Sequence, residues 1–173
     1  YGGSLIRKEA TGYGVAQSVL NWANANNINL QNKTYIIQGL GNVGYYAAKK
    51  LSDYGMIMTG AGDHTSYIVN KNGLDTKDVL NFIDNKNTLD KYDTIQCAKV
   101  TKKDFFSTPC DVIIPAALQL QILEQESFDI NCKAIIEAAN GPINEQADKI
   151  LQNKGTDVIP DIYANGGGVI VSY

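Results

Sequence analysis

The sequence has few of the residues that build metal centres, disulfide frameworks or nucleic-acid interfaces. Its 173 residues include three cysteines, one histidine and 15 basic side chains against 18 acidic ones. Cys97, Cys110 and Cys132 are widely spaced, odd in number and lack a Cys-x-x-Cys pair, so neither a disulfide framework nor a thiolate metal site is predicted. A net charge of -3 offers no basic surface for a phosphate backbone. We therefore expect no metal, no nucleic-acid partner and a reducing compartment.

Long apolar runs are also missing. No run approaches the roughly 20 residues that a membrane-spanning helix needs, and the apolar segment 111–118 is interrupted by Pro115. The chain opens on Tyr1 without an initiator Met or a signal-peptide pattern, which is typical of a trimmed piece of a longer protein. A length of 173 residues with 44% hydrophobic residues suits one compact domain. We expect a single soluble domain, spanning residues 1–173, with no membrane partner.

What the sequence does contain is an alternation of short apolar runs with segments of helical periodicity. Helices are expected over residues 8–27, 43–54, 76–85 and 144–153, and strands over residues 34–38, 56–61, 111–114, 134–137 and 157–159. Thr76 can cap the helix that it begins. The polar, aperiodic segment 85–102 predicts no element. The alternation predicts an α/β, Rossmann-like doubly wound, mostly parallel sheet with helices on both faces.

The glycine cluster at residues 39–44 fits the pattern G-x-G-x-x-G, directly after a predicted strand and at the start of a predicted helix. Gly39 permits a tight turn, Gly41 lets a pyrophosphate approach the backbone, and Gly44 lets helix and strand pack closely. The helix N-terminus then offers free N–H groups to an anion. Glycines also mark ordinary strand-to-helix turns, so the motif alone leaves a purely structural interpretation open.

An acidic residue at the end of the next predicted strand strengthens the dinucleotide interpretation. Asp63 follows Gly44 by about 20 residues, where a carboxylate can accept hydrogen bonds from the adenosine ribose. An ionised Asp would repel a 2′-phosphate, which favours NAD over NADP. The adjacent His64 is either a plain loop residue or a cation that offsets this repulsion, so NADP stays possible.

Five ordered motifs closely resemble the glutamate dehydrogenase family. Residues 2–14 are similar to its GGSxGRxEATGxG stretch, although Ile6 replaces the usual Gly; the other four motifs are residues 38–44, 114–117, 137–142 and 160–169. Ala138 also stands where many members have Gly. The resemblance implies the C-terminal NAD(P)-binding domain. Leucine, valine and phenylalanine dehydrogenases, which usually differ at residues 139–142, are the alternative; a non-catalytic nucleotide-sensing module and a glycine-rich methyltransferase are others.

The resemblance also implies site residues and an activity. Arg7 and Ser172 would hold the substrate's side-chain carboxylate. Cofactor contacts would come from Thr11, Gly39, Gly41, Asn42, Val43, Gly44, Asp63, His64, Ala116, Ala117, Asn140 and Asn165. Each Asn also has a structural interpretation as a turn residue. The implied reaction is oxidative deamination of L-glutamate to 2-oxoglutarate and ammonia, with hydride transfer to NAD.

No stretch of the chain resembles the family's glycine-rich lysine motif or its acid–base carboxylate. We therefore expect no catalytic residue in this chain, which would bind cofactor without turning substrate over. The resemblance further implies a small-molecule substrate, a homo-oligomeric full-length enzyme, and a cytoplasmic or mitochondrial-matrix location.

Overall fold

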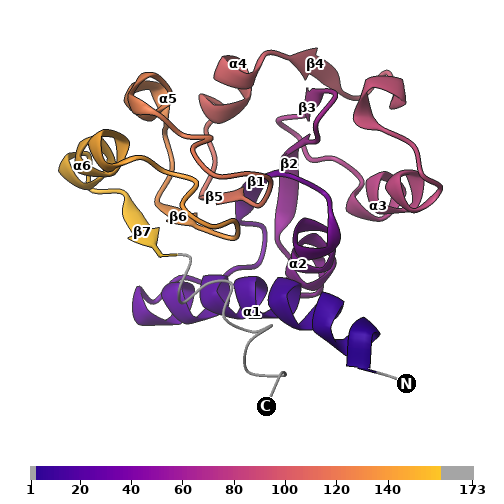
Figure 1. Ribbon diagram of the computed structural model, residues 1–173, viewed down its shortest axis with the longest axis horizontal. Helices are drawn as coiled ribbons and strands as arrows, with labels where there is room; N and C mark the ends of the chain where they lie inside the picture. The colour runs from indigo at the N-terminus through magenta and orange to yellow at the C-terminus, as the bar shows by residue number, and fades with distance from the viewer. Residues whose placement is uncertain (1–2, 161–173) are drawn as a thin grey trace.

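The computed structural model describes residues 3–160, and side chains from residue 9 onward. Its centre is a seven-stranded sheet with the strand order β4-β3-β2-β1-β5-β6-β7 (Figure 1). The elements in chain order are α1 (Gly3–Ala25), β1 (Thr34–Gln38), α2 (Asn42–Asp53), β2 (Ile57–Gly62), β3 (Tyr67–Val69), α3 (Thr76–Asp84), η1 (Leu89–Lys91), β4 (Ala98–Val100), α4 (Lys102–Phe106), β5 (Val112–Pro115), α5 (Glu124–Asp129), β6 (Ala134–Ile136), α6 (Glu145–Asn153) and β7 (Asp157–Ile159).

The order of the strands creates a switch point beside β1. The chain builds outward from β1 through β2, β3 and β4, and then crosses back to place β5 on the other side of β1. Strands β2, β1, β5, β6 and β7 are parallel. Beyond β2, β3 pairs antiparallel with β2, and β4 pairs antiparallel with β3. Doubly wound sheets bind ligands outside the carboxyl ends of their strands at this kind of reversal. The predicted fold class is confirmed.

Helices cover both faces because the central strands are apolar on both sides. In β1, Tyr35 and Ile37 pack into the core cluster that contains α1, α2 and α3. Ile36 packs into the second cluster, which contains residues of α4 and α6 and Ile130 just after α5. All three side chains are fully buried. Figure 1 shows α1 along the lower side of the molecule with α2 above it, and α5 and α6 on the left. The run of consecutive apolar residues is thus typical of a parallel strand covered on both faces.

Several details differ from the sequence-based expectations. Helix α1 ends at Ala25, and Asn27 just beyond it has a positive φ of 55°. Asp75, and not Thr76, caps α3, because its carboxylate accepts a hydrogen bond from the Asp78 N–H at 3.0 Å. The segment 85–102, for which no element was expected, contains η1 and the edge strand β4. Within residues 3–160, no helix is long and apolar enough to cross a bilayer.

Candidate functional site

A cavity of about 700 Å³ lies at the carboxyl ends of β1, β2 and β5, which is the switch point of the sheet. Four loops and the end of α3 form most of its walls. The lining residues are Gln38, Gly39, Leu40, Gly41, Asp63, His64, Thr65, Ser66, Tyr67, Ile83, Asn87, Thr88, Ala116, Ala117, Leu118 and Gln121. A second cavity of about 580 Å³ beside α6 and β7 contains none of the predicted cofactor residues.

The three glycines of the turn have three different environments. Gly39 has a φ of +95°, and a Cβ there would lie 2.7 Å from the backbone carbon and oxygen of Ala116, so only glycine fits. A Cβ on Gly44 would lie 1.8 Å from the Gly39 carbonyl oxygen, which places helix α2 tightly against the turn. A Cβ on Gly41 would meet no atom within 4 Å. The backbone at Gly41 is therefore open to the cavity.

Helix α2 begins directly at this open position. Gly41 is its N-cap and has no side chain to accept a hydrogen bond from the first turn. The first N–H groups of an α-helix have no partner inside the helix, and together with the helix dipole they attract anions. The wall formed by Gly39, Gly41 and the first turn of α2 can therefore bind a phosphate group.

Asp63 contributes a negative charge to the lining of the cavity. Its Oδ1 accepts hydrogen bonds from the Thr65 N–H (2.7 Å), the Thr65 hydroxyl (2.6 Å) and the Ser66 N–H (3.0 Å), and its Oδ2 accepts one from the Leu89 N–H (2.7 Å). Partial burial raises the pKa of Asp63, but these hydrogen bonds more than offset it and hold the pKa below its ordinary value. These four donors match the roughly four acceptor positions of a carboxylate, so the charge of Asp63 is held in place at the cavity.

Most of the described cofactor candidates converge on this cavity. The ones that line it are Gly39, Gly41, Asp63, His64, Ala116 and Ala117. Asn42, Val43 and Gly44 form the first turn of α2, directly after Gly41. Thr11 lies in α1, directly before Gly12. A Cβ added to Gly12 would lie 2.6 Å from Cβ of Tyr46 in α2, so α1 and α2 are in close contact beside Thr11.

The remaining predicted site residues either do not line the cavity or lie outside the residues that the structure describes. Asn140 is exposed in the turn between β6 and α6 and is not among the cavity residues. Asn165 and Ser172 lie outside the described residues. Arg7 belongs to α1, but its side chain also lies outside the described part. The substrate end of the predicted site therefore stays a prediction.

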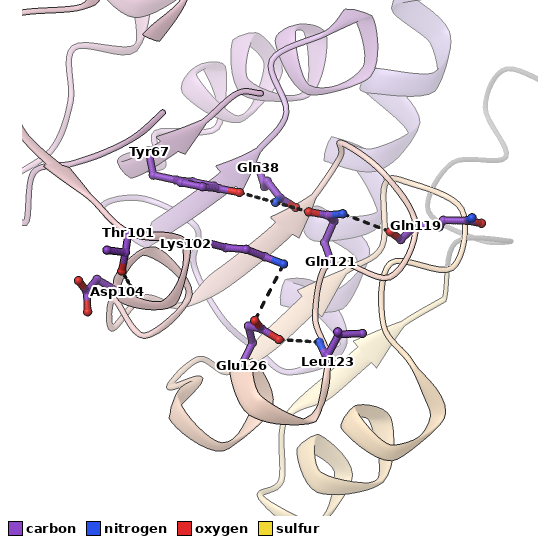
Figure 2. Close-up of polar contacts among 9 residues, drawn as sticks. All are labelled: Gln38, Tyr67, Thr101, Lys102, Asp104, Gln119, Gln121, Leu123 and Glu126. Carbon is purple, nitrogen blue, oxygen red and sulfur yellow. Dashed lines mark hydrogen bonds and ion pairs between the residues drawn. The ribbon is translucent and has the colours of Figure 1, made fainter. Parts of the chain in front are cut away.

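The cavity also contains polar side chains that the motif analysis did not single out (Figure 2). Gln38 lies at the end of β1, and its Nε2 donates to the hydroxyl oxygen of Tyr67 and to Oε1 of Gln121, both at 2.9 Å. Gln38 is only 2% exposed. Its position directly before Gly39 was visible in the motif, whereas the residues that it contacts come from β3 and from the loop after β5, where no local pattern marks them.

Comparison with known proteins gives the same family across the whole sequence. The family model described as Glutamate/Leucine/Phenylalanine/Valine dehydrogenase matches residues 2–173. A mitochondrial glutamate dehydrogenase of Dictyostelium discoideum is 37% identical over 99% of this chain and 36% of its own length. An NADP-specific glutamate dehydrogenase of Saccharolobus shibatae is 36% identical (99% of this chain, 40% of its own), and an NAD-specific one of Staphylococcus aureus is 34% identical (99% and 41%).

Solved structures of similar proteins share the fold. Glutamate dehydrogenase 2 of Plasmodium falciparum superimposes with a TM-score of 0.88 at 34% identity, over 96% of this chain and 39% of that one. A hetero-hexameric glutamate dehydrogenase of Thermus thermophilus, in a leucine-bound form, gives a TM-score of 0.87 at 25% identity, over 96% and 38%. The chain thus spans about two-fifths of the relatives that it matches.

Proposed function

Because the chain belongs to the glutamate/leucine/phenylalanine/valine dehydrogenase family, we propose that it is the C-terminal dinucleotide-binding domain of a glutamate dehydrogenase. The cavity at the switch point binds a nicotinamide dinucleotide. The observation that carries this proposal is the open backbone at Gly41, which faces the cavity at the uncapped start of α2. A pyrophosphate placed there receives N–H groups and the positive end of the helix dipole.

The cofactor proposed is NAD in preference to NADP. Relatives of both specificities match the chain, so family membership leaves the choice open. Asp63 supports NAD, because its low pKa keeps the carboxylate ionised in the cavity wall. Two like charges about 4 Å apart repel by roughly 1 kcal/mol in water and about 4 kcal/mol near a protein surface. The exposed His64 beside Asp63 is the side chain that could weaken this discrimination.

The test is a pair of calorimetric titrations with NADH and NADPH near neutral pH. The wild-type chain is expected to bind NADH more tightly, and Asp63→Asn is expected to narrow the ratio of the two dissociation constants. The ratio of the dissociation constants for NADH and NADPH is informative, because a variant that binds both cofactors more weakly by the same factor leaves it unchanged. The control is Asp53→Asn, which removes an exposed carboxylate at the opposite end of α2 from Gly41 and should leave the ratio unchanged. Equal affinities in the wild type would contradict the NAD assignment.

For the whole protein, we propose oxidative deamination of L-glutamate, with the hydride carried by the cofactor. Arg7 and Ser172 would hold the substrate's side-chain carboxylate, and Thr11, Asn140 and Asn165 would contact the cofactor. Because the chain spans about two-fifths of its relatives, residues elsewhere in the whole protein would supply acid–base catalysis. The hexameric Thermus structure supports an oligomeric assembly.

A turnover assay tests whether catalysis requires residues outside this chain. The 173-residue chain with NAD and L-glutamate should produce no measurable NADH, whereas a protein with the remaining domain should be active. Turnover by the chain alone, at a rate unaffected by Arg7→Ala, would contradict the proposal. Assays of the active protein with L-leucine, L-valine and L-phenylalanine separate glutamate from the other substrates named for the family.

A further inference from the structure

The polar network in the cavity runs through four residues in a defined direction. The Nε2 group of Gln121 donates to the backbone carbonyl of Gln119 at 3.2 Å, and Oε1 of Gln121 accepts from Gln38 at 2.9 Å. Gln38 donates in turn to the hydroxyl oxygen of Tyr67 at 2.9 Å. Figure 2 shows these contacts as a continuous line from Gln119 to Tyr67.

The carbonyl of Gln119 determines which atoms donate along this line. A carbonyl oxygen can only accept, so the group of Gln121 that faces it must be the NH₂ group, and Oε1 of Gln121 then faces Gln38. Gln38 must therefore present its own NH₂ group, and one hydrogen goes to Gln121 and the other to Tyr67. Both amide hydrogens are used. The buried Oε1 of Gln38 has no partner in the described part of the chain.

In the same arrangement the Tyr67 hydroxyl accepts a hydrogen bond but donates none to a described residue. Its oxygen accepts from Gln38, and among the described residues no acceptor receives its O–H. Tyr67 lines the cavity together with Gln38, Gln121 and Asp63. A tyrosine hydroxyl has one hydrogen to donate. That hydrogen is therefore available to a ligand in the cavity.

The Tyr67 ring is held firmly in this position. Its strand pairs it with Gly62 of β2, where an added Cβ would lie 2.5 Å from Cδ1 of the ring. The ring also packs on Phe105 of α4, with 4.8 Å between the ring centroids. A donor that is already fixed loses little conformational entropy when a ligand binds. A side chain at position 62 would thus displace the ring from this position.

We propose that the Tyr67 hydroxyl donates a hydrogen bond to the adenosine half of the bound dinucleotide, and that Gln38 and Gln121 are positioning residues that direct its proton. This assignment rests on the proposed function. We choose the adenosine half because Asp63 and Ser66 line the cavity close to Tyr67 in the sequence, directly after β2. In this fold the adenosine ribose binds at the end of that strand. Purine ring nitrogens and ribose oxygens supply acceptors for such a donor.

Tyr67→Phe tests the assignment, with NADH and AMP as ligands. Both affinities should fall by the same factor, roughly two- to tenfold, as expected for one neutral hydrogen bond. The preference for NADH over NADPH should not change, because the hydroxyl is uncharged. The control is Tyr54→Phe, which removes a hydroxyl at the far end of α2 and should leave both affinities unchanged. Circular dichroism on each variant checks that the fold is retained.

A double-mutant cycle tests the direction of the network. In Gln121→Met the Gln38 amide can turn over, so that its Oε1 accepts the Tyr67 proton and NADH binding weakens. In the Tyr67→Phe background the same change should have no further effect, and full additivity would overturn the positioning role of Gln38 and Gln121. Wild-type binding with unchanged affinity in Tyr67→Phe would overturn the Tyr67 assignment alone. A wild-type chain that binds neither NADH nor NADPH would overturn the proposed function and this assignment with it.

Discussion

The carboxylate of Asp63 accepts a hydrogen bond from the backbone N–H of Leu89, which lies 26 residues further along the chain, at 2.7 Å. The contact joins the end of β2 to η1, and a second bond from the Asp90 N–H to the Thr65 hydroxyl (3.1 Å) reinforces it. Asn87 and Thr88, directly before Leu89, line the cavity. The charge proposed to select the cofactor therefore also shapes the wall beside it.

Replacing Asp63 by Asn should destabilise the protein as well as weaken cofactor selection. Asn keeps one accepting oxygen, but the donors that face its NH₂ group, either the Leu89 N–H or the Thr65 and Ser66 groups, would lose their acceptor. We expect the free energy of unfolding at neutral pH to fall by about 1–3 kcal/mol. Urea denaturation followed by circular dichroism measures it. An unchanged unfolding midpoint would show that Asp63 does not hold η1.

The contribution of Asp63 to stability should also depend on pH. Its pKa is lower in the folded chain than the value of about 3.9 for an unperturbed Asp. A carboxyl group of this kind stabilises the fold above the unfolded pKa, and the contribution is lost as the pH falls through the folded pKa. The difference in unfolding free energy between wild type and Asp63→Asn should therefore be constant near neutral pH and shrink below about pH 4. A difference that grows in acid would contradict this.

The parts of the fold that were predicted from the sequence are those with strong local patterns. Strands β1 and β7 have the expected bounds, and β1 is buried from Tyr35 to Gln38 between turn signals. The segment 85–102 lacks such a pattern, because its order comes from tertiary contacts. Leu89 is fully buried against distant residues, and Ala98 and Lys99 of β4 are exposed at the sheet edge. Neither apolar alternation nor helical periodicity could reveal these elements.

The same distinction applies to the candidate site. The glycine turn was found because Gly39, Gly41 and Gly44 are close in sequence, and Asp63 was found at a characteristic spacing from them. The network of Tyr67 and Gln121 was not, because their contacts with Gln38 span 29 and 83 residues of sequence. Only the pairing of β3 with β2 and the return of the chain at β5 bring these side chains together.

Lys154 should stabilise the end of helix α5. Its Nζ donates to the carbonyl oxygens of Ser127 (3.1 Å), Phe128 (2.9 Å) and Ile130, which lie at the end of the helix where carbonyls lack partners inside it. Lys154→Met should lower the free energy of unfolding by roughly 1–2 kcal/mol. Lys149→Met is the control, because its exposed ion pair with Glu145 should contribute little to stability. Equal effects of the two changes in urea denaturation would contradict the assigned role of Lys154.

The last prediction separates the structural glycines of the turn from the one that a ligand requires. Gly44→Ala should destabilise the fold by more than about 2 kcal/mol, because its Cβ would lie 1.8 Å from the Gly39 carbonyl oxygen and the backbone would have to move. Gly41→Val should leave the fold intact, because its Cβ meets no atom within 4 Å and its φ of -70° is ordinary for any residue.

The same Gly41→Val side chain occupies the space that a pyrophosphate needs, so NADH binding should become undetectable. Circular dichroism and the fluorescence of added NADH, recorded on one sample of each variant, separate loss of fold from loss of binding. Retained NADH binding in a folded Gly41→Val protein would mean that the glycine turn is only structural, and the cofactor would then have to approach the cavity from the side of Asp63 and Tyr67.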